Sequence, residues 1–122
     1  NLEGIIMDDR STTIIELKKI VEDFVNERDW SQFHNPKNLS MALAIEASEL
    51  MDIFKWNTIQ ECESMMSEKN TRQDATDELA DIMIYALAFS NRNNINILKN
   101  KTAALSNPHE HAKFSDTFHQ IC

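Results

Sequence analysis

The sequence predicts an all-α protein, and two observations support this fold class. The 122 residues include one glycine and two prolines, far fewer than a turn-rich β fold uses. Apolar residues recur at helical spacing through most of the chain. The chain length suits one domain with one modest core. We place this domain at residues 13–106.

The first helix is expected to begin at Thr13, which is followed three residues later by Glu16. This spacing is that of a capping box, in which the two side chains satisfy each other's backbone N–H groups. The apolar stripe that follows ends near Arg28. Residues 29–36 lack the stripe and end in proline, so they are expected to form a loop.

The second helix is expected to run from about Leu39 to Lys55 and is apolar nearly all round. Leucines lie on one side of it, and Met41, Ile45 and Met51 lie on another. Such a helix must be covered on most of its faces. A chain of this length has too few other helices to cover it, so we expect partner subunits.

Three further helices are expected. Thr58 and Glu61 form a second capping box that opens a short helix through Met65. A long helix is placed at about 72–90, with a stop at residues 93–94, and a last helix at about 97–105. Residues 1–12 are expected to be disordered or vector-derived, and 107–122 to form a mobile C-terminal tail.

The charge balance argues against nucleic acid polymers as partners. The chain has 12 basic and 20 acidic residues, a formal net charge of -8, whereas binding to a phosphate backbone depends on excess lysine and arginine. No apolar run approaches the ~18 residues of a membrane span, and neither Cys62 nor Cys122 has the spacing of a metal site. We therefore expect a reduced, cytoplasmic chain that does not enter a membrane.

Two pairs of acidic residues occupy helix faces with apolar neighbours. Glu46 and Glu49 are three residues apart, and Glu78 and Asp81 repeat this spacing in the long helix. Residues three apart share a helix face, so four carboxylates converge if the two faces meet. Two charges ~6 Å apart repel by about 3 kcal/mol at an effective dielectric of 20, which favours neutralisation by protons or metal. Oxygen ligands select hard ions, which predicts Mg²⁺ or Mn²⁺; the alternative is a solvated acidic edge on each helix.

Large rings are concentrated at both ends of the second helix. Trp30, Phe33 and His34 precede it, and Trp56 follows it. A nucleobase stacks on aromatic rings, so these residues are candidates for a base-binding slot. The alternative is that they close the end of a helical bundle.

These residues resemble the all-α nucleoside triphosphate pyrophosphatase superfamily of MazG-type proteins, and specifically its dCTP pyrophosphatase branch. The resemblance covers about Ile14 to Leu98. Its specific part is the order of the motifs, ExxE followed by tryptophan and then by ExxD on a later helix. The matching segments are RDWSQFH at 28–34, PKNL at 36–39, EASEL at 46–50, FKW at 54–56 and DELADI at 77–82, together with Tyr85.

The resemblance implies a four-helix-bundle core with a short accessory helix, assembled as a homotetramer that is a dimer of dimers. It implies Mg²⁺-dependent hydrolysis of dCTP or a related dNTP to the monophosphate and pyrophosphate, in a nucleotide-pool housekeeping role. The implied metal ligands are Glu46, Glu49, Glu78 and Asp81. The implied base pocket contains Trp30, His34 and Trp56, with Tyr85 beside the sugar or phosphates.

Some roles stay open at this point. Glu49 is our choice for the group that orients the attacking water, and Glu46 is equally able to do so. The C-terminal part departs from the family pattern, with Ala104 near the position of the family's lysine. Candidate phosphate contacts are therefore spread over Lys37, Lys55, Arg92, Lys101 and Lys113.

Two other functions remain as alternatives. One is a dUTP-type hydrolase, which would share the superfamily chemistry. The other is a non-enzymatic oligomeric helical regulatory module, in which the acidic pairs have only a structural role.

Overall fold

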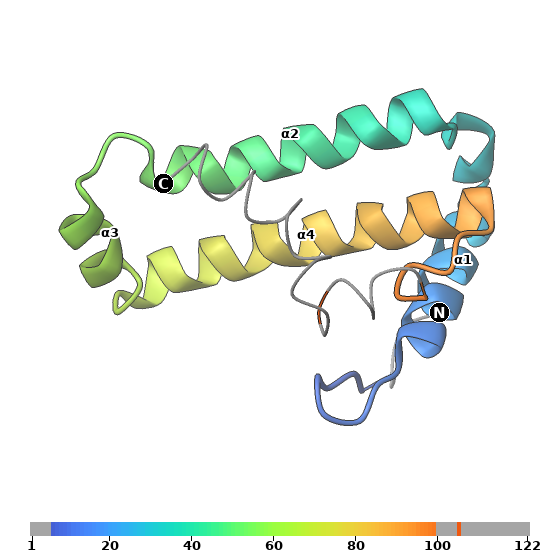
Figure 1. Ribbon diagram of the computed structural model, residues 1–122, viewed down its shortest axis with the longest axis horizontal. Coiled ribbons are helices and arrows are strands. Elements are labelled where there is room, and N and C mark those ends of the chain that lie inside the picture. Colours follow the sequence, from blue (N-terminus) through green and yellow to red (C-terminus); the bar gives the residue numbers. More distant parts are fainter. Residues whose placement is uncertain (1–5, 100–104, 106–122) are drawn as a thin grey trace.

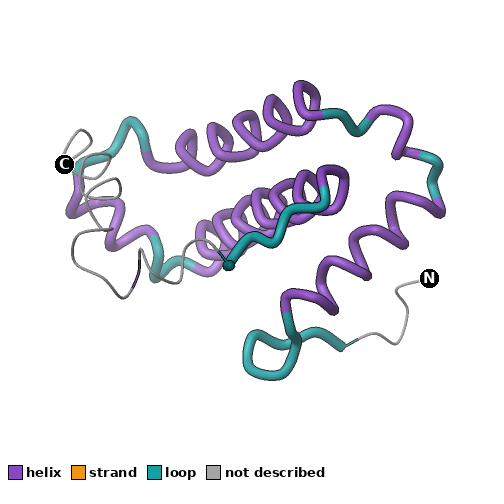
Figure 2. Tube along the Cα trace, turned by 45° about the vertical axis from the view of Figure 1, so that its right-hand side comes forward, coloured by secondary structure: helices purple, strands orange, loops and turns teal. Residues whose placement is uncertain are grey.

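A computed structural model describes residues 6–99 and Leu105, and every regular element in residues 6–99 is a helix. The elements are α1 (Ile14–Glu27), the 3₁₀ helix η1 (Trp30–Phe33), α2 (Pro36–Phe54), α3 (Ile59–Met65) and α4 (Lys69–Asn93). Short loops join the helices, and residues 6–99 contain no strand (Figure 2). The predicted all-α class is confirmed.

The two long helices form the framework of the molecule. α2 and α4 run antiparallel and side by side, and they pack against each other more extensively than any other pair of elements (Figure 1). α3 turns the chain between them at one end of the pair. α1 packs on α4 at the other end, where η1 leads into α2.

The buried core lies at the end of the helix pair that α1 covers. Its centre is made by Val21 of α1, Leu39 of α2, and Leu87 and Ala88 of α4. Leu39 is only 2% exposed. Beyond this end, large apolar side chains are open to solvent along both long helices, namely Met41, Ile45, Met51, Leu79, Met83 and Ile84. The apolar surface that the sequence places around the second helix is therefore left uncovered within one chain.

α2 begins three residues earlier than the sequence analysis expects. Pro36 occupies the first turn, and the Asn35 side chain accepts a hydrogen bond of 2.9 Å from the Asn38 backbone N–H. Proline suits this position because the N–H groups of a first turn have no partner within the helix. The proline therefore starts the helix instead of marking the loop.

Both predicted threonine caps are present, and the reciprocal capping box forms at one of them. At Thr58 both bonds of the capping box form, with the Glu61 carboxylate accepting from the Thr58 backbone N–H at 2.9 Å. At Thr13 the hydroxyl accepts from the Glu16 N–H at 3.2 Å and donates to the Glu16 carboxylate at 3.0 Å, which differs from the expected reciprocal box. α4 begins three residues before the expected residue 72 and runs to Asn93, at the predicted stop.

α4 stops where predicted, because Asn94 adopts the left-handed conformation with φ of 54°. Residues 97–99, the start of the expected last helix, form a turn. Residues 100–104 of that helix and the expected tail at 107–122 lie outside the described residues. Before α1, Asp8 and Thr12 close a short hydrogen-bonded turn.

Candidate metal centre and nucleotide pocket

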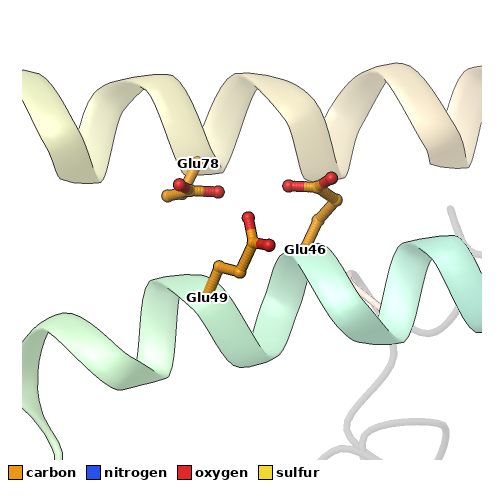
Figure 3. Close-up of side chains that lie close together, drawn as sticks. All are labelled: Glu46, Glu49 and Glu78. Carbon is orange, nitrogen blue, oxygen red and sulfur yellow. The ribbon is translucent and has the colours of Figure 1, made fainter.

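Three of the four predicted carboxylates converge between the two long helices. Glu46 and Glu49 project from one face of α2, and Glu78 projects toward them from α4 (Figure 3). One oxygen of each residue lies within 4.8 Å of the others. The antiparallel pairing of α2 and α4 thus brings together residues that are about 30 positions apart in the sequence.

Asp81 lies beside this group. It follows Glu78 by three residues on α4, and its charge raises the pKa of Glu46. It lines a neighbouring cavity together with Glu46, while the tight group of three is made by the glutamates. The predicted fourth ligand therefore stands at the side of the cluster that faces this cavity.

The cluster is electrostatically unsatisfied. Glu46 Oε2 and Glu78 Oε2 are buried and have no hydrogen-bond partner. Burial, and then the neighbouring carboxylates Glu49 and Glu46, raise the pKa of Glu78 to about 7. Burial is also the first cause that raises the pKa of Glu46, followed by Glu49. Close carboxylates in this state need a shared proton or a cation.

These residues fit a hard divalent ion. Their donors are carboxylate oxygens, which suit Mg²⁺ or Mn²⁺ better than soft metals. The two unpartnered oxygens are groups that an ion would satisfy. The structure thus supports the metal prediction through the geometry and burial of the carboxylates.

A cavity of about 260 Å³ adjoins the cluster on the side of Asp81. Its walls come from α1, η1, α2 and α4, and they include four of the predicted site residues in addition to Glu46. The lining residues are Phe24, Val25, Trp30, His34, Glu46, Asp81, Ile84, Tyr85 and Ala88. The fold therefore places aromatic surface directly beside the carboxylates.

Trp30 is held in this wall by its neighbours. The Trp30 and Phe24 rings pack in a T-shaped arrangement with a centroid distance of 5.5 Å. The Arg28 guanidinium lies 3.5 Å from the centre of the Phe24 ring and 5.9 Å from that of Trp30. These contacts orient the indole before any ligand is present.

His34 adds an imidazole to the wall. Burial lowers its pKa, so the imidazole is neutral at pH 7 and can both donate and accept a hydrogen bond. Such a group suits the edge of a base, which presents donors and acceptors. The structure places His34 in the cavity wall, and its role at the base edge stays a prediction.

Trp56 is not brought to this cavity in the same chain. It follows the C-terminal end of α2, whereas Trp30 precedes the N-terminal end. The 19 residues of α2 span about 28 Å at 1.5 Å per residue. Trp56 is 86% exposed, and the Lys55 ammonium lies 5.4 Å from the centre of its ring. One chain therefore cannot wall a single base pocket with both indoles.

The predicted cations are dispersed. Lys37 is exposed in the first turn of α2, and Lys55 pairs with Asp52 at 2.7 Å. Arg92 donates from Nε to the His34 backbone oxygen at 2.7 Å. Lys101 and Lys113 lie outside the described residues. These positions and contacts assign none of the described cations to phosphate binding.

Sequence reasoning missed four residues of the cavity wall, namely Phe24, Val25, Ile84 and Ala88. Phe24 belongs to the apolar stripe of α1 and was expected to serve the core. Phe24 lies four residues before Arg28, so the two share a face of the helix. This spacing was the available signal that Phe24 lies near the aromatic turn. Ile84 follows Asp81 by three residues and shares its face of α4.

The fold and the site define a helical protein with a candidate carboxylate metal centre beside an aromatic pocket. Over 85 residues, 70% of this chain and 50% of the relative, the sequence is 33% identical to dCTP pyrophosphatase 1 of Rattus norvegicus. Proteins of the same name from Bos taurus and Homo sapiens are each 36% identical over 80 residues, which are 66% of this chain and 47% of theirs. No protein-family model matches the chain.

These relatives confirm the resemblance to the dCTP pyrophosphatase branch. The chain spans about half the length of the curated relatives it matches. Within the described residues, every helix is too short or too polar to cross a membrane.

Proposed function

We propose that this chain is a metal-dependent nucleoside triphosphate pyrophosphohydrolase that acts on dCTP or a closely related deoxynucleotide. The observation that carries the proposal is the convergence of Glu46, Glu49 and Glu78, two of which bury an unpartnered oxygen. The cavity with aromatic walls beside this cluster supports a nucleotide as ligand. The names of the curated relatives point to the same substrate.

Glu46, Glu49, Glu78 and Asp81 would hold Mg²⁺, with Mn²⁺ as a possible substitute. Bound there, the metal supplies Lewis-acid polarisation of the phosphoryl group and a lowered pKa of bound water. Glu49 is the exposed member of the three glutamates, so it is the carboxylate most open to an attacking water. We assign it to orient that water and accept its proton, with Glu46 as the alternative.

The cavity beside the cluster would take the nucleoside. Trp30 offers a ring for stacking, which contributes ~1–3 kcal/mol per base without selecting among bases. Selection then rests on the neutral His34 imidazole at the base edge. Tyr85 of α4 lies in the same wall and would pack against the sugar. Lys37 and Lys101 remain our candidates for the phosphates.

A second copy of the chain would complete this site. The exposed apolar surface of α2 and α4 supports an oligomer, and we propose a homotetramer built as a dimer of dimers in the cytoplasm. Trp56 would reach the base pocket of a neighbouring chain, because α2 separates it from the pocket of its own chain.

A panel of deoxy- and ribonucleoside triphosphates with Mg²⁺ tests this function. We expect release of pyrophosphate and the monophosphate, fastest from dCTP, and none in EDTA. A preference for dUTP would replace the proposed substrate by the dUTP-type alternative. Absence of turnover with every nucleotide, together with no effect of Mg²⁺ on stability, would favour the regulatory module.

A further inference from the structure

The turn that carries Trp30 and His34 is held by side-chain bonds to its own carbonyl groups. Gln32 donates to the Asp29 oxygen at 3.0 Å, and Asn38 donates from the first turns of α2 to the Phe33 oxygen at 3.0 Å. Gln32 lies within the turn, and Asn38 follows it closely in sequence. These bonds fix the shape of the turn, which spans residues 29–35, but not its distance from α4.

Arg92 makes the connection to α4. Its Nε donates to the His34 backbone oxygen at 2.7 Å across 58 positions of sequence. α4 is also the helix that carries Glu78 and Asp81. The bond therefore joins the aromatic wall of the pocket to the helix that supplies half of the predicted metal ligands.

His34 stands between two cavities. On one side is the pocket beside the carboxylates, and on the other is a cavity of about 220 Å³ that Arg92, Asn91 and Ser31 help to line. With open space on both sides, packing alone does not hold this residue in place. A hydrogen bond from α4 to the His34 carbonyl group adds a restraint that packing does not supply.

We propose that Arg92 is a positioning residue, which sets His34 and Trp30 against the carboxylate cluster and thereby supports base selection. This inference rests on the proposed function and reassigns a residue first considered for phosphate binding. Arg92 lies 14 positions after Glu78 on α4, which is about 21 Å along the helix axis. An arginine side chain that is already engaged at His34 does not cover that distance to phosphates at the cluster of its own chain.

Three substitutions separate a positioning role from a charge role. In glutamine the side-chain nitrogen is as many bonds from Cα as arginine Nε, so Arg92→Gln keeps a donor in place and removes the charge. Arg92→Lys keeps the charge but moves the nitrogen one atom further out. Arg92→Met removes both. Lys69→Met, in the first turn of α4 at the opposite end, is the control for loss of one positive charge.

The first measurement needs no nucleotide. Hydrogen–deuterium exchange of residues 29–35 should be about tenfold faster in Arg92→Met than in the native chain, the scale expected for losing a hydrogen bond to a charged group. Arg92→Gln should keep most of the protection, Arg92→Lys less of it, and Lys69→Met all of it. Faster exchange in Arg92→Gln than in Arg92→Lys would overturn the proposal.

The second measurement uses the ratio of kcat/KM for dCTP to that for dTTP. A positioning role predicts that this ratio falls from the native chain to Arg92→Gln, then to Arg92→Lys and then to Arg92→Met. A phosphate contact predicts instead that Arg92→Lys is closest to the native chain and that kcat/KM falls equally for every base. An equal loss for both nucleotides would overturn the proposal. If the native chain hydrolyses no nucleotide, the proposed function fails, while the exchange measurement still decides whether Arg92 holds the turn.

Discussion

Glu78 makes the stability of this fold depend on pH. Its pKa is raised from 4.5 to about 7, first by burial and then by Glu49 and Glu46. In the unfolded chain it keeps its ordinary value, so between pH 4.5 and 7 the folded chain binds more protons than the unfolded chain. The stabilisation by this proton is present at the acid side of that window and is lost as the pH rises through it.

We therefore expect the metal-free protein to lose thermal stability as the pH rises from about 5 to about 8. Glu78→Gln should flatten this dependence and raise Tm at the alkaline end, because the neutral amide needs no proton. Melting followed by circular dichroism in EDTA measures both. Glu63→Gln on α3 is the matched control for loss of one acidic group and should behave as the native chain does. An unchanged pH slope in Glu78→Gln would contradict the role assigned to this carboxyl group.

Metal binding by the carboxylates should be measurable directly. Millimolar Mg²⁺ should raise the Tm of the native chain, because an ion that binds only the folded state stabilises it by mass action. Glu46→Ala, Glu49→Ala, Glu78→Ala and Asp81→Ala should each lose this rise and lose turnover while keeping their helicity. Full activity in any one of the four would remove that residue from the site.

At the scale of elements, the start of α2 matters because it determines where the aromatic turn ends. Asn35 caps the helix one residue after His34. Asn35→Ala should reduce the free energy of unfolding by about 1 kcal/mol, the usual cost of losing an N-cap. Urea denaturation measures this loss. Asn35→Ser keeps an acceptor and should cost little, so equal losses in both variants would contradict the capping role.

Local signals in the sequence were sufficient for the helices and for the two acidic faces. Caps and apolar periodicity placed α1, α3 and α4, and the three-residue spacing of Glu46 and Glu49 correctly put them on one face. These features depend on residues within one or two turns of each other.

What the sequence could not supply depends on contacts between distant residues. The sequence analysis expected a loop where the 3₁₀ helix η1 forms. The residue that ends η1, His34, is bound by Arg92, which is 58 positions away and therefore gives no local signal. The spacing of Glu78 and Asp81 indicated a shared face, but only the packing of α2 on α4 shows that Glu78 enters the tight group. In the same way, the length of α2 separates Trp56 from Trp30, although both flank the same helix.

At the scale of the whole molecule, the open apolar faces of α2 and α4 support the proposed oligomer. Ile45 is 54% exposed on α2 and Leu79 is 60% exposed on α4. Exposed apolar surface of this extent along two adjoining helices is typical of an interface. Light scattering should therefore return a multiple of 14.1 kDa, and a monomer mass at micromolar concentration would contradict the proposed tetramer.

The position of the two tryptophans at opposite ends of α2 has a genetic consequence. If each pocket takes Trp30 from one chain and Trp56 from its neighbour, Trp30→Ala and Trp56→Ala are defects that complement each other. Alone, each variant should raise KM about tenfold, the equivalent of ~1.4 kcal/mol. Co-expressed, the two chains form mixed pairs in which one pocket lacks both indoles and the other has both. Normal KM should then return in a fraction of the sites, whereas indoles that served a single chain's pocket would give no recovery in any mixture.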